Sequence, residues 1–397
     1  MDFAYSPKVQ ELRERVTAFM DAYVYPAEPV FERQVAEGDR WQPTAIMEEL
    51  KARAKAEGLW NLFLPESELG AGLSNLEYAP LAEIMGRSLL GPEPFNCSAP
   101  DTGNMEVLVR YATQAQKQQW LEPLLRGEIR SAFAMTEPDN GAGSDPSLMK
   151  VTAEKRGDKF VINGRKWLIT GYPGASLVIV MAKTLDTDGT DLGATMFLVP
   201  MDTPGMKLVE MHNTMDSNSP GGHAIIDFQD LEVPVEDVLG DVGQGFRNAQ
   251  VRLAPARMTH CMRWLGQARR CHDIAAGHAN YRKAFGKTIG QHQGIGFQLA
   301  DSEIELNLCR LAIWHCCWLL DRGEQARSEV SQCKVFCSEA LGRVVDRSLQ
   351  VLGGMGIMDT TIIERTYRDI RAFRIYDGPS EVHRHVLARG IAKAAGQ

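Results

Sequence analysis

The chain has 397 residues, of which 44% are hydrophobic and 24% charged, and its formal net charge is -8 at pH 7. This composition is typical of a soluble globular protein, and a chain of this length is expected to form more than one packed region. The negative charge argues against a nucleic-acid or anionic-membrane partner, because both require a basic surface.

Residues 1–127 are predicted to form a helical N-terminal domain. Apolar residues recur at steps of three and four from Leu12 to Tyr23, and Pro26 is expected to end that helix. Further helices are expected from Pro43 to Gly58 and from Gln114 to Leu125.

Residues 128–240 are predicted to form a middle β domain. Four runs are rich in β-forming residues: 151–154, 159–162, 177–181 and 196–199. Turn-forming pairs follow these runs: Gly157-Asp158, Asn163-Gly164 and Asp188-Gly189. Short strands separated by turns favour an antiparallel barrel or sandwich.

Residues 241–397 are predicted to form a C-terminal helical domain. Amphipathic helices are expected at 245–285, 291–321 and 327–352, and Pro255 is expected to kink or break the first. The order helix, β, helix lacks the βαβ alternation of a dinucleotide-binding parallel sheet. The predicted fold class is therefore α+β.

The cysteines predict neither a metal site nor a disulfide framework, because no pair has CxxC spacing and several lie beside aromatic residues. We interpret all eight as buried reduced thiols. The N-terminus lacks the charged and apolar segments of a secretory signal, and the C-terminus does not resemble a peroxisomal signal. No apolar stretch reaches the roughly 20 residues that cross a bilayer. We therefore expect a cytoplasmic protein without a membrane span.

Two segments of the β domain can hold a flat heterocyclic ligand. Residues 133–145 read FAMTEPDNGAGSD, where small residues permit close backbone approach and Thr136 and Ser144 offer hydroxyl groups. Residues 166–171 read KWLITG, and Trp167 can pack against a conjugated ring. Read alone, the first segment is as readily a mobile surface loop, and Trp167 more readily a core residue.

Two further segments lie among the C-terminal helices. Residues 281–293 read YRKAFGKTIGQHQ, where Arg282 offers a planar guanidinium to a pyrophosphate and Phe285 a ring to adenine or ribose. Residues 350–356 read QVLGGMG, with glycines that permit close approach to a nucleotide. The simpler interpretations are a basic surface loop and a helix-capping turn.

Together with Asp377 in the run IYDGPSE (375–381), these four segments resemble, in order and spacing, the motifs of the acyl-CoA dehydrogenase family. The resemblance covers essentially the whole chain. It implies an N-terminal helical domain, a middle antiparallel β-barrel and a C-terminal four-helix bundle. It also implies FAD as cofactor and α,β-dehydrogenation of an acyl-CoA thioester to the 2-enoyl-CoA, with hydride transfer to flavin N5.

The resemblance assigns roles to single residues. The flavin ring would be held by Phe133, Met135, Thr136, Gly143, Ser144, Trp167, Ile169 and Thr170. The adenosine pyrophosphate, held by a neighbouring subunit, would be bound by Arg282, Phe285, Gln293, Gln350, Gly353 and Gly354. Pro379 and Glu381 would make the last flavin contacts, and the substrate would contact Ser144, Arg257 and Gly378. A homodimer or homotetramer follows from the shared cofactor site.

Asp377 stands where the family has its catalytic base. Removal of the α proton requires a base on one face of the substrate and a hydride acceptor on the other. A carboxylate that loses its water when substrate fills the pocket has a raised pKa and becomes a better base. Some relatives carry the base beside the CoA-contacting arginine, but that position is Ala256 here, which cannot take a proton.

The sequence departs from the common family pattern in three places. Asp377 replaces a glutamate, the stacking tryptophan of the family falls at Leu168 with Trp167 one position earlier, and Asp139-Asn140 lengthens the glycine loop. The aspartate, with the runs 58–65, 99–108 and 260–263, resembles the branch that includes eukaryotic members with a fused kinase-like domain. Some of those members act on long-chain or 4-hydroxyacyl-CoA, and we expect no such fused domain here.

The expected function is that of an acyl-CoA dehydrogenase that passes electrons to an electron-transfer flavoprotein. One alternative is an acyl-CoA oxidase that uses oxygen, although such oxidases usually have an extra C-terminal domain for which 397 residues leave no room. Another is a non-catalytic flavin-binding relative, which the retained carboxylate argues against. The length, branching and hydroxylation of the acyl group are not predicted.

Overall fold

The computed structural model describes residues 3–64, 68–215 and 221–396. The chain folds into two compact units, each built from several chain segments. Unit 1 takes its described residues from 1–28, 65–92 and 256–397, and unit 2 from 29–64 and 93–255. The boundaries predicted after residues 127 and 240 stay a prediction.

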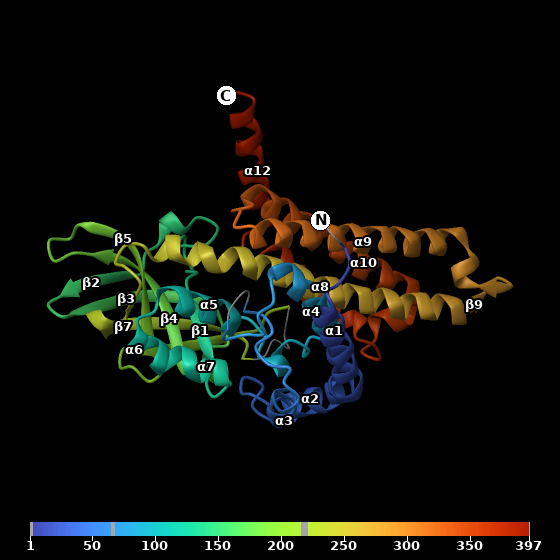
Figure 1. Cartoon of the computed structure of the whole chain (residues 1–397), viewed down its shortest axis with the longest axis horizontal. Coiled ribbons are helices and arrows are strands. Elements are labelled where there is room, and N and C mark those ends of the chain that lie inside the picture. The colour runs from blue at the N-terminus through green and yellow to red at the C-terminus, as the bar shows by residue number, and fades with distance from the viewer. Residues whose placement is uncertain (1–2, 65–67, 216–220, 397) are drawn as a thin grey trace. The chain divides into compact units, whose positions relative to one another are not determined.

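The N-terminal part is helical, as predicted (Figure 1). Its helices are α1 (Pro7–Phe19), α2 (Tyr25–Glu37), α3 (Ala45–Ala56), α4 (Asn75–Gly86), α5 (Asp101–Tyr111), α6 (Gln114–Gln116) and α7 (Glu122–Arg126). The predicted stop at Pro26 is wrong. A π-helical segment, Met20–Val24, joins α1 to α2, and Pro26 falls in the first turn of α2, where the change from π- to α-helical hydrogen bonding accommodates a residue without an N–H.

The two other predicted N-terminal helices are present. The helix expected from Pro43 to Gly58 is α3, which follows Thr44. The helix expected at 114–125 consists of α6, a π-helical segment at Lys117–Leu121 and α7. Gly127 ends it in the left-handed conformation, as a glycine C-cap is expected to do.

The middle domain is a mixed sheet (Figure 1). Its strands are β1 (Ser131–Ala134), β2 (Thr152–Arg156), β3 (Lys159–Thr170), β4 (Leu177–Leu185), β5 (Asp191–Pro200), β6 (Met206–His212), β7 (His223–Pro234) and β8 (Val238–Leu239). Their order in the described part is β6-β7-β3-β2-β4-β5-β8, and β1 also pairs with β4.

This sheet corrects the antiparallel barrel that we predicted. β1 and β2 both pair with β4 in parallel, while the other described pairings are antiparallel. Parallel pairing is possible because each of these strands reaches β4 through a long connection that returns the chain to the same end of the sheet. The pairings among the described residues do not close the sheet into a barrel.

The predicted turn at Asn163-Gly164 is also wrong. Both residues lie inside β3, where the register with β7 shifts between Ile162 and Gly164. Such a shift is typical of a β-bulge, in which one residue is left without a partner. Gly164 has φ +133°, and an added Cβ would lie 2.9 Å from the side chain of Val151, so glycine is needed there.

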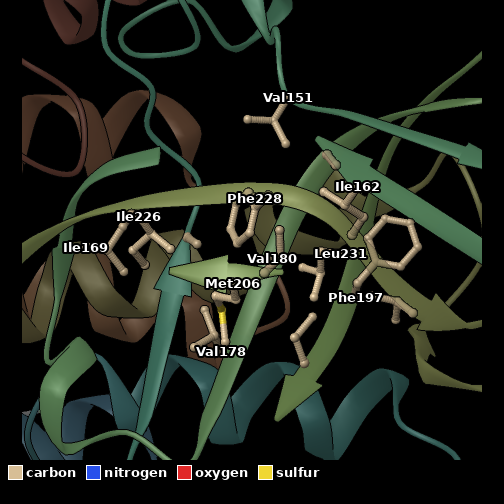
Figure 2. Close-up of a cluster of buried hydrophobic side chains, with 14 of the residues drawn as sticks. Val151, Ile162, Ile169, Val178, Val180, Phe197, Met206, Ile226, Phe228 and Leu231 are labelled. Carbon is tan, nitrogen blue, oxygen red and sulfur yellow. The ribbon is translucent and has the colours of Figure 1, made fainter. Parts of the chain in front are cut away.

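A hydrophobic core formed by strand side chains supports this sheet (Figure 2). The side chains of Val178, Val180 and Phe197 are fully buried. Ile169 belongs to the same core and is 1% exposed. Burial of a large apolar side chain contributes roughly 1.5–3 kcal/mol to the free energy of unfolding. Ile169 therefore anchors the segment that carries Trp167 and Thr170.

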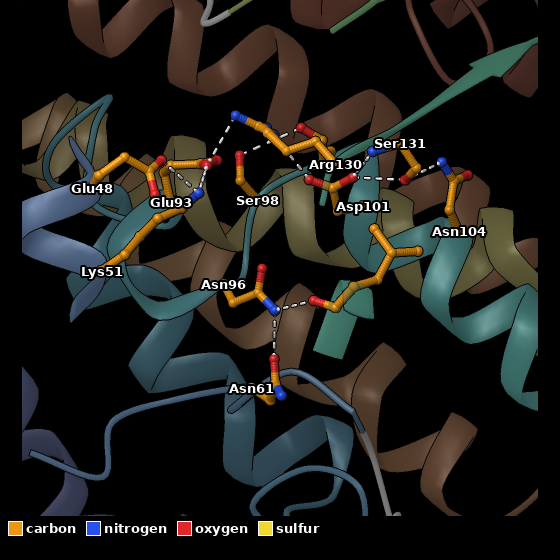
Figure 3. A network of polar contacts seen from close by, with 12 residues as sticks. Glu48, Lys51, Asn61, Glu93, Asn96, Ser98, Asp101, Asn104, Arg130 and Ser131 are labelled. Carbon is orange, nitrogen blue, oxygen red and sulfur yellow. Dashed lines mark hydrogen bonds and ion pairs between the residues drawn. The ribbon is translucent and has the colours of Figure 1, made fainter. Parts of the chain in front are cut away.

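A buried polar network links the helices of unit 2 to the first strand (Figure 3). Arg130 pairs with Glu93 at 2.9 Å and with Asp101 at 3.2 Å. Asp101, the first residue of α5, also accepts hydrogen bonds from the backbone N–H and the hydroxyl of Ser131. Buried charges require partners, and this network thereby fixes the start of β1, which leads into the segment 133–145.

The predicted C-terminal helices are confirmed as α8 (Gly245–Tyr281), α9 (Gln293–Asp321) and α10 (Arg327–Leu352). The shorter helices α11 (Ile363–Asp369) and α12 (Ser380–Ala394) follow. Helix α8 continues through Pro255 without the predicted break. The strands β9 (Lys283–Ala284) and β10 (Lys287–Thr288) form a hairpin between α8 and α9, and α10 packs on α9 and α12.

Candidate active site

Asp377 lies in a tight turn of unit 1, between a 3-10 segment at Ile370–Arg374 and α12. Both Asp377 and Gly378 have left-handed backbone conformations, with φ +53° and +95°. A Cβ on Gly378 would also lie 2.7 Å from Nε2 of His383, so only glycine fits. Aspartate is among the non-glycine residues that tolerate this conformation best, and the chain therefore presents Asp377 at the tip of the turn.

Side chains from other helices bind the main chain of this turn. The carbonyl oxygen of Asp377 accepts hydrogen bonds from Nε of Arg257 on α8 at 2.9 Å and from Nε2 of His383 on α12 at 3.1 Å. Nζ of Lys334 on α10 donates to the carbonyl oxygens of Phe373 at 2.7 Å and Gly378 at 3.0 Å. Three helices therefore fix the backbone position of the predicted base.

His383 is held as a neutral donor. Its Nε2 faces a carbonyl oxygen and must carry the proton, and its Nδ1 lies 3.1 Å from the hydroxyl of Ser331, which can donate to it. Burial lowers the pKa of His383 to about 4, and Arg257 and Lys334 contribute in the same direction. The imidazole is therefore uncharged at neutral pH.

Cationic groups surround the turn. Arg257, which we expect to contact CoA, lies with Nε against Asp377, and burial lowers the pKa of its guanidinium although Asp377 opposes that shift. Burial also lowers the pKa of Lys334 to about 8. On the carboxylate itself, Nε2 of His260 lies 3.1 Å from Oδ2. Two cationic side chains and one polar imidazole therefore lie around the predicted base.

In unit 2, the structure brings Thr136 and Trp167 together. The backbone N–H of Trp167 donates to the carbonyl oxygen of Thr136 at 3.1 Å, and the hydroxyl of Thr136 donates to the carbonyl oxygen of Trp167 at 2.7 Å. Phe133 and Met135, on the same segment, are half-buried. The hydroxyl of Thr170, at the end of β3, lies 2.9 Å from Nδ1 of His223.

A bulge in β3 lies at Trp167 and Leu168, the positions where the tryptophan is shifted by one residue from the family pattern. The register between β3 and β7 changes between Lys166 and Ile169, and Leu168 has φ +55°. The extra residue lets Trp167 remain half-buried while Leu168 is 42% exposed and Ile169 is directed into the core. Ile169, which we expect to wall the flavin, can therefore offer a ligand little beyond its backbone.

A buried ion pair shapes the segment 133–145. Nζ of Lys166 lies 2.8 Å from Oε1 of Glu137, and both side chains are almost fully buried. Burial alone would raise the pKa of Glu137, but the charge of Lys166 and hydrogen bonds from the N–H groups of Lys150 and Val151 outweigh it and lower that pKa. Beyond this pair, Gly143 and Ser144 are exposed.

The residues expected to bind the adenosine pyrophosphate lie on two elements of unit 1. Arg282, Phe285 and Gln293 are at the β9–β10 hairpin and the start of α9, and Phe285 is 96% exposed. Gln350, Gly353 and Gly354 are exposed at the end of α10. Pro379 and Glu381 lie at the start of α12, directly after Asp377 and Gly378.

The cysteines are buried with free thiols, as predicted. The sequence separates them widely, but α8 and α10 bring three together: the sulfur atoms of Cys261, Cys333 and Cys337 lie within 4.8 Å of one another. Cys333 and Cys337 are one turn apart on α10, with 3.8 Å between their sulfur atoms. These buried thiols pack between α8 and α10 in the way that small apolar side chains do.

Five residues with a clear structural part in these sites were not predicted from the sequence: Glu137, Lys166, His260, Lys334 and His383. A signal existed for His260, because Arg257 and His260 are three residues apart on one helix and must share a face. Nothing in the sequence distinguishes Lys334 from a surface lysine of an amphipathic helix, although its side chain is fully buried.

The residues present fit a flavin. A flat ring system needs partly exposed aromatic and apolar side chains beside hydroxyl and backbone polar groups. Trp167 and Phe133 are half-buried, and the hydroxyl of Thr136 donates to the carbonyl oxygen of Trp167. The open space around Gly143, where an added Cβ would contact nothing within 4 Å, leaves room for a ligand at the loop.

Among the described residues, no helix combines the length and the apolar character needed to cross a bilayer.

The chain matches the sequence profiles of the acyl-CoA dehydrogenase N-terminal domain over residues 6–128, the middle domain over 132–230 and the C-terminal domain over 243–392. It is 41% identical to acyl-CoA dehydrogenase family member 10 of Mus musculus over 97% of this chain, which spans only 37% of the mouse protein. It is also 41% identical to FadE2 of Mycobacterium tuberculosis, assigned as an acyl-CoA dehydrogenase, over 98% of this chain and 96% of that protein.

Solved structures agree with these relatives. A Mycobacterium abscessus structure assigned as an acyl-CoA dehydrogenase has a TM-score of 0.93 at 43% identity, covering 99% of this chain and 100% of that chain. Butyryl-CoA dehydrogenase of Megasphaera elsdenii gives 0.86 at 26% identity, covering 99% and 100%. The FAD complex of PigA gives 0.84 at 25% identity, covering 99% of each chain. The chain therefore belongs to the acyl-CoA dehydrogenase family and has the fold of its FAD-dependent members.

Proposed function

We propose that this chain catalyses the FAD-dependent α,β-dehydrogenation of an acyl-CoA thioester, with Asp377 as the base that removes the α proton. The observation that carries this proposal is the Asp377 turn. Arg257, His383 and Lys334 fix its backbone, and the carboxylate, 22% exposed, lies beside neutral His260. A solvated turn on the surface requires no such support, whereas a base must be held within a fraction of an ångström.

The residues of the turn then have defined tasks. Asp377 takes the α proton, and the backbone N–H groups of the turn polarise the thioester carbonyl so that this proton becomes more acidic. When bound, FAD supplies the hydride acceptor. Ala256, beside Arg257 on α8, offers no second base.

The flavin ring would be held by residues of unit 2. The ring would lie against Phe133, Met135, Thr136, Trp167 and Thr170, with Gly143 and Ser144 at its side. A similar fold binds FAD in PigA, which supports this assignment. Arg282, Phe285, Gln293, Gln350, Gly353 and Gly354 would bind the adenosine pyrophosphate of FAD on a neighbouring subunit.

A homodimer or homotetramer is part of this proposal. Helix α9 exposes large apolar side chains at steps of seven, four and three residues: Phe297, Ile304, Leu308 and Leu311. These steps place them on one face of the helix. A contiguous exposed apolar face marks a protein–protein interface more often than a solvated surface. Size-exclusion chromatography with light scattering should give a mass of two or four chains of 44.0 kDa.

For the substrate and the electron acceptor, we propose only the chemical class. The relatives support a CoA thioester, and the aspartate branch suggests long-chain or 4-hydroxyacyl esters. Electrons would pass to an electron-transfer flavoprotein. An oxidase would instead reduce oxygen to peroxide.

Flavin reduction tests the proposal. The FAD-loaded protein is mixed anaerobically with a panel of CoA esters that differ in chain length and 4-hydroxylation, and the loss of the oxidised-flavin absorbance is followed. Asp377→Asn should retain FAD and slow reduction by roughly a hundredfold or more, whereas Asp346→Asn, exposed on α10, should not.

Each alternative gives a different result. Normal reduction in Asp377→Asn would exclude this residue as the base. Stoichiometric peroxide in air would identify an oxidase. A wild-type flavin that no ester reduces would identify a non-catalytic relative.

A further inference from the structure

His260 lies on α8 one turn beyond Arg257 and faces the predicted base. Its Nε2 is 3.1 Å from Oδ2 of Asp377, and the two side chains are only 17% and 22% exposed. The imidazole also packs on Tyr376, with 4.8 Å between the ring centroids. Because this contact is largely removed from water, the interaction between the two groups is strengthened.

Arg263, one turn further along α8, decides which nitrogen of His260 carries the proton. A terminal nitrogen of its guanidinium lies 2.7 Å from Nδ1 of His260. A guanidinium has donors only, so Nδ1 must accept, and the single N–H of a neutral imidazole is left at Nε2, toward Asp377. Burial and then the charge of Arg263 lower the pKa of His260, which outweighs the opposite effect of Asp377 and keeps the imidazole neutral.

We propose that His260 is a positioning residue for the base: its Nε2–H faces one oxygen of the Asp377 carboxylate at ion-pair distance, without the alignment of a full hydrogen bond, and restrains that oxygen electrostatically while Arg263 fixes the tautomer. This inference rests on the proposed role of Asp377. The arrangement reverses a Ser-His-Asp triad, in which a carboxylate orients an imidazole that moves the proton. In this chain the carboxylate moves the proton and the imidazole only supports it.

The proton balance follows from that geometry. The α C–H bond of the substrate breaks, its proton forms an O–H bond with the carboxylate oxygen that does not face His260, and the electron pair enters the new C=C bond. The β C–H bond would break with its hydride passing to the acceptor that FAD supplies when bound. The proton on Nε2 of His260 stays in place throughout. An aspartate has one torsion fewer than a glutamate, so a donor fixed on one oxygen also directs the other.

The charged and titratable groups that face this pair come from every helix around it: Arg257 and Arg263 on α8, Lys334 on α10, Glu381 and His383 on α12, and Tyr376 in the turn. None of the cations among them offers an acceptor to Nε2 of His260. The carboxylate of Asp377 is therefore the natural acceptor for that N–H.

The first test is the pH profile of flavin reduction. His260→Phe keeps a ring against Tyr376 but removes the donor, and a carboxylate that loses a donor to its charged form has a higher pKa. The acid limb should move up by about one pH unit, so reduction should slow by up to about tenfold at pH values below both limbs and stay unchanged well above them. His260→Gln, which retains an amide N–H, should restore most of the wild-type profile, whereas His385→Phe, exposed on α12, should not alter it.

Arg263→Met provides a second test, because it removes the guanidinium that keeps the proton of His260 on Nε2. It should move the acid limb in the same direction as His260→Phe and have no further effect when combined with it. An unchanged acid limb in His260→Phe, or a His260→Gln profile as defective as that of His260→Phe, would overturn the inference.

Thermal unfolding separates this inference from the proposed function. In the FAD-loaded protein, the Tm loss of the His260→Phe, Asp377→Ala double variant should be smaller than the sum of the two single losses, because each single change removes the same contact. If no CoA ester reduces the wild-type flavin, the proposed function fails, yet this coupling still reports the contact. Additive Tm losses would show that His260 does not hold Asp377.

Discussion

The guanidinium of Arg257 binds the main chain of Asp377, with 2.9 Å between Nε and the carbonyl oxygen. An arginine expected to contact CoA thus also fixes the turn that carries the predicted base. Substrate binding and positioning of the base would then depend on one side chain.

Arg257→Lys tests that double role. Lysine carries a point charge on a flexible stem and cannot reproduce the planar donor geometry. We expect kcat to fall about tenfold and KM for the CoA ester to rise, since a misplaced base slows the chemical step. Arg389→Lys, exposed on α12, serves as the control. A raised KM with unchanged kcat would assign Arg257 to the substrate alone.

Gly378→Ala should disturb the turn. The new methyl group would lie 2.7 Å from Nε2 of His383 at a φ of +95°, and strain of this kind costs roughly 1–3 kcal/mol. We expect a lower Tm and slower flavin reduction.

Gly390→Ala on α12 is the matched control. An added Cβ there meets nothing within 4 Å, and the change in a helix should stabilise by up to about 1 kcal/mol. Equal Tm changes in the two variants would show that the turn at Gly378 is not strained by a side chain.

Stability should fall in acid through His383. Its pKa is near 6.5 when unfolded and about 4 in the fold, so the unfolded chain binds more protons between these values and the folded state loses stability as pH falls from 6.5 to 4. The loss should be on the order of 2–3 kcal/mol. Chemical denaturation of wild type and His383→Gln at pH 7 and pH 4.5 measures it. A variant that loses as much stability as wild type over this range would contradict the assignment.

Glu137→Gln should open the glycine loop. It leaves buried Lys166 without its charged partner, and breaking a buried ion pair costs roughly 3–5 kcal/mol. We expect weaker FAD retention during gel filtration and a lower Tm. Glu154→Gln, whose exposed partner is Arg156, should change neither. Full FAD retention in Glu137→Gln would mean that the ion pair does not organise the loop.

Much of the fold could be predicted from the sequence where local signals agree with the final structure. The long helices follow apolar periodicity, and Gly127 follows a capping rule. The errors occur where backbone geometry depends on distant partners. Pro26 fits a helix only because the π-helical segment before it shifts the hydrogen-bond register, and the strand continues through Asn163-Gly164 only because β7 pairs with it and carries the extra residue.

The candidate site divides in the same way. Asp377 is proposed as the base because five motifs occur in a fixed order, and that order singles out a residue without any knowledge of its surroundings; its role stays a prediction. Lys334, His383 and Glu137 could not be predicted, because their roles consist of hydrogen bonds to carbonyl and N–H groups far away in sequence. A buried lysine and a surface lysine have the same sequence signature until the partners are known.

The donors around the turn bond to the carbonyl oxygens of residues 373, 377 and 378. Those hydrogen bonds involve only main-chain oxygen atoms. They hold the backbone of the turn without using the side chain at position 377. A glutamate at position 377 would therefore keep these hydrogen bonds to the main chain. The exchange alters the reach of the carboxyl group by one methylene, and with it the depth at which a substrate must lie to react.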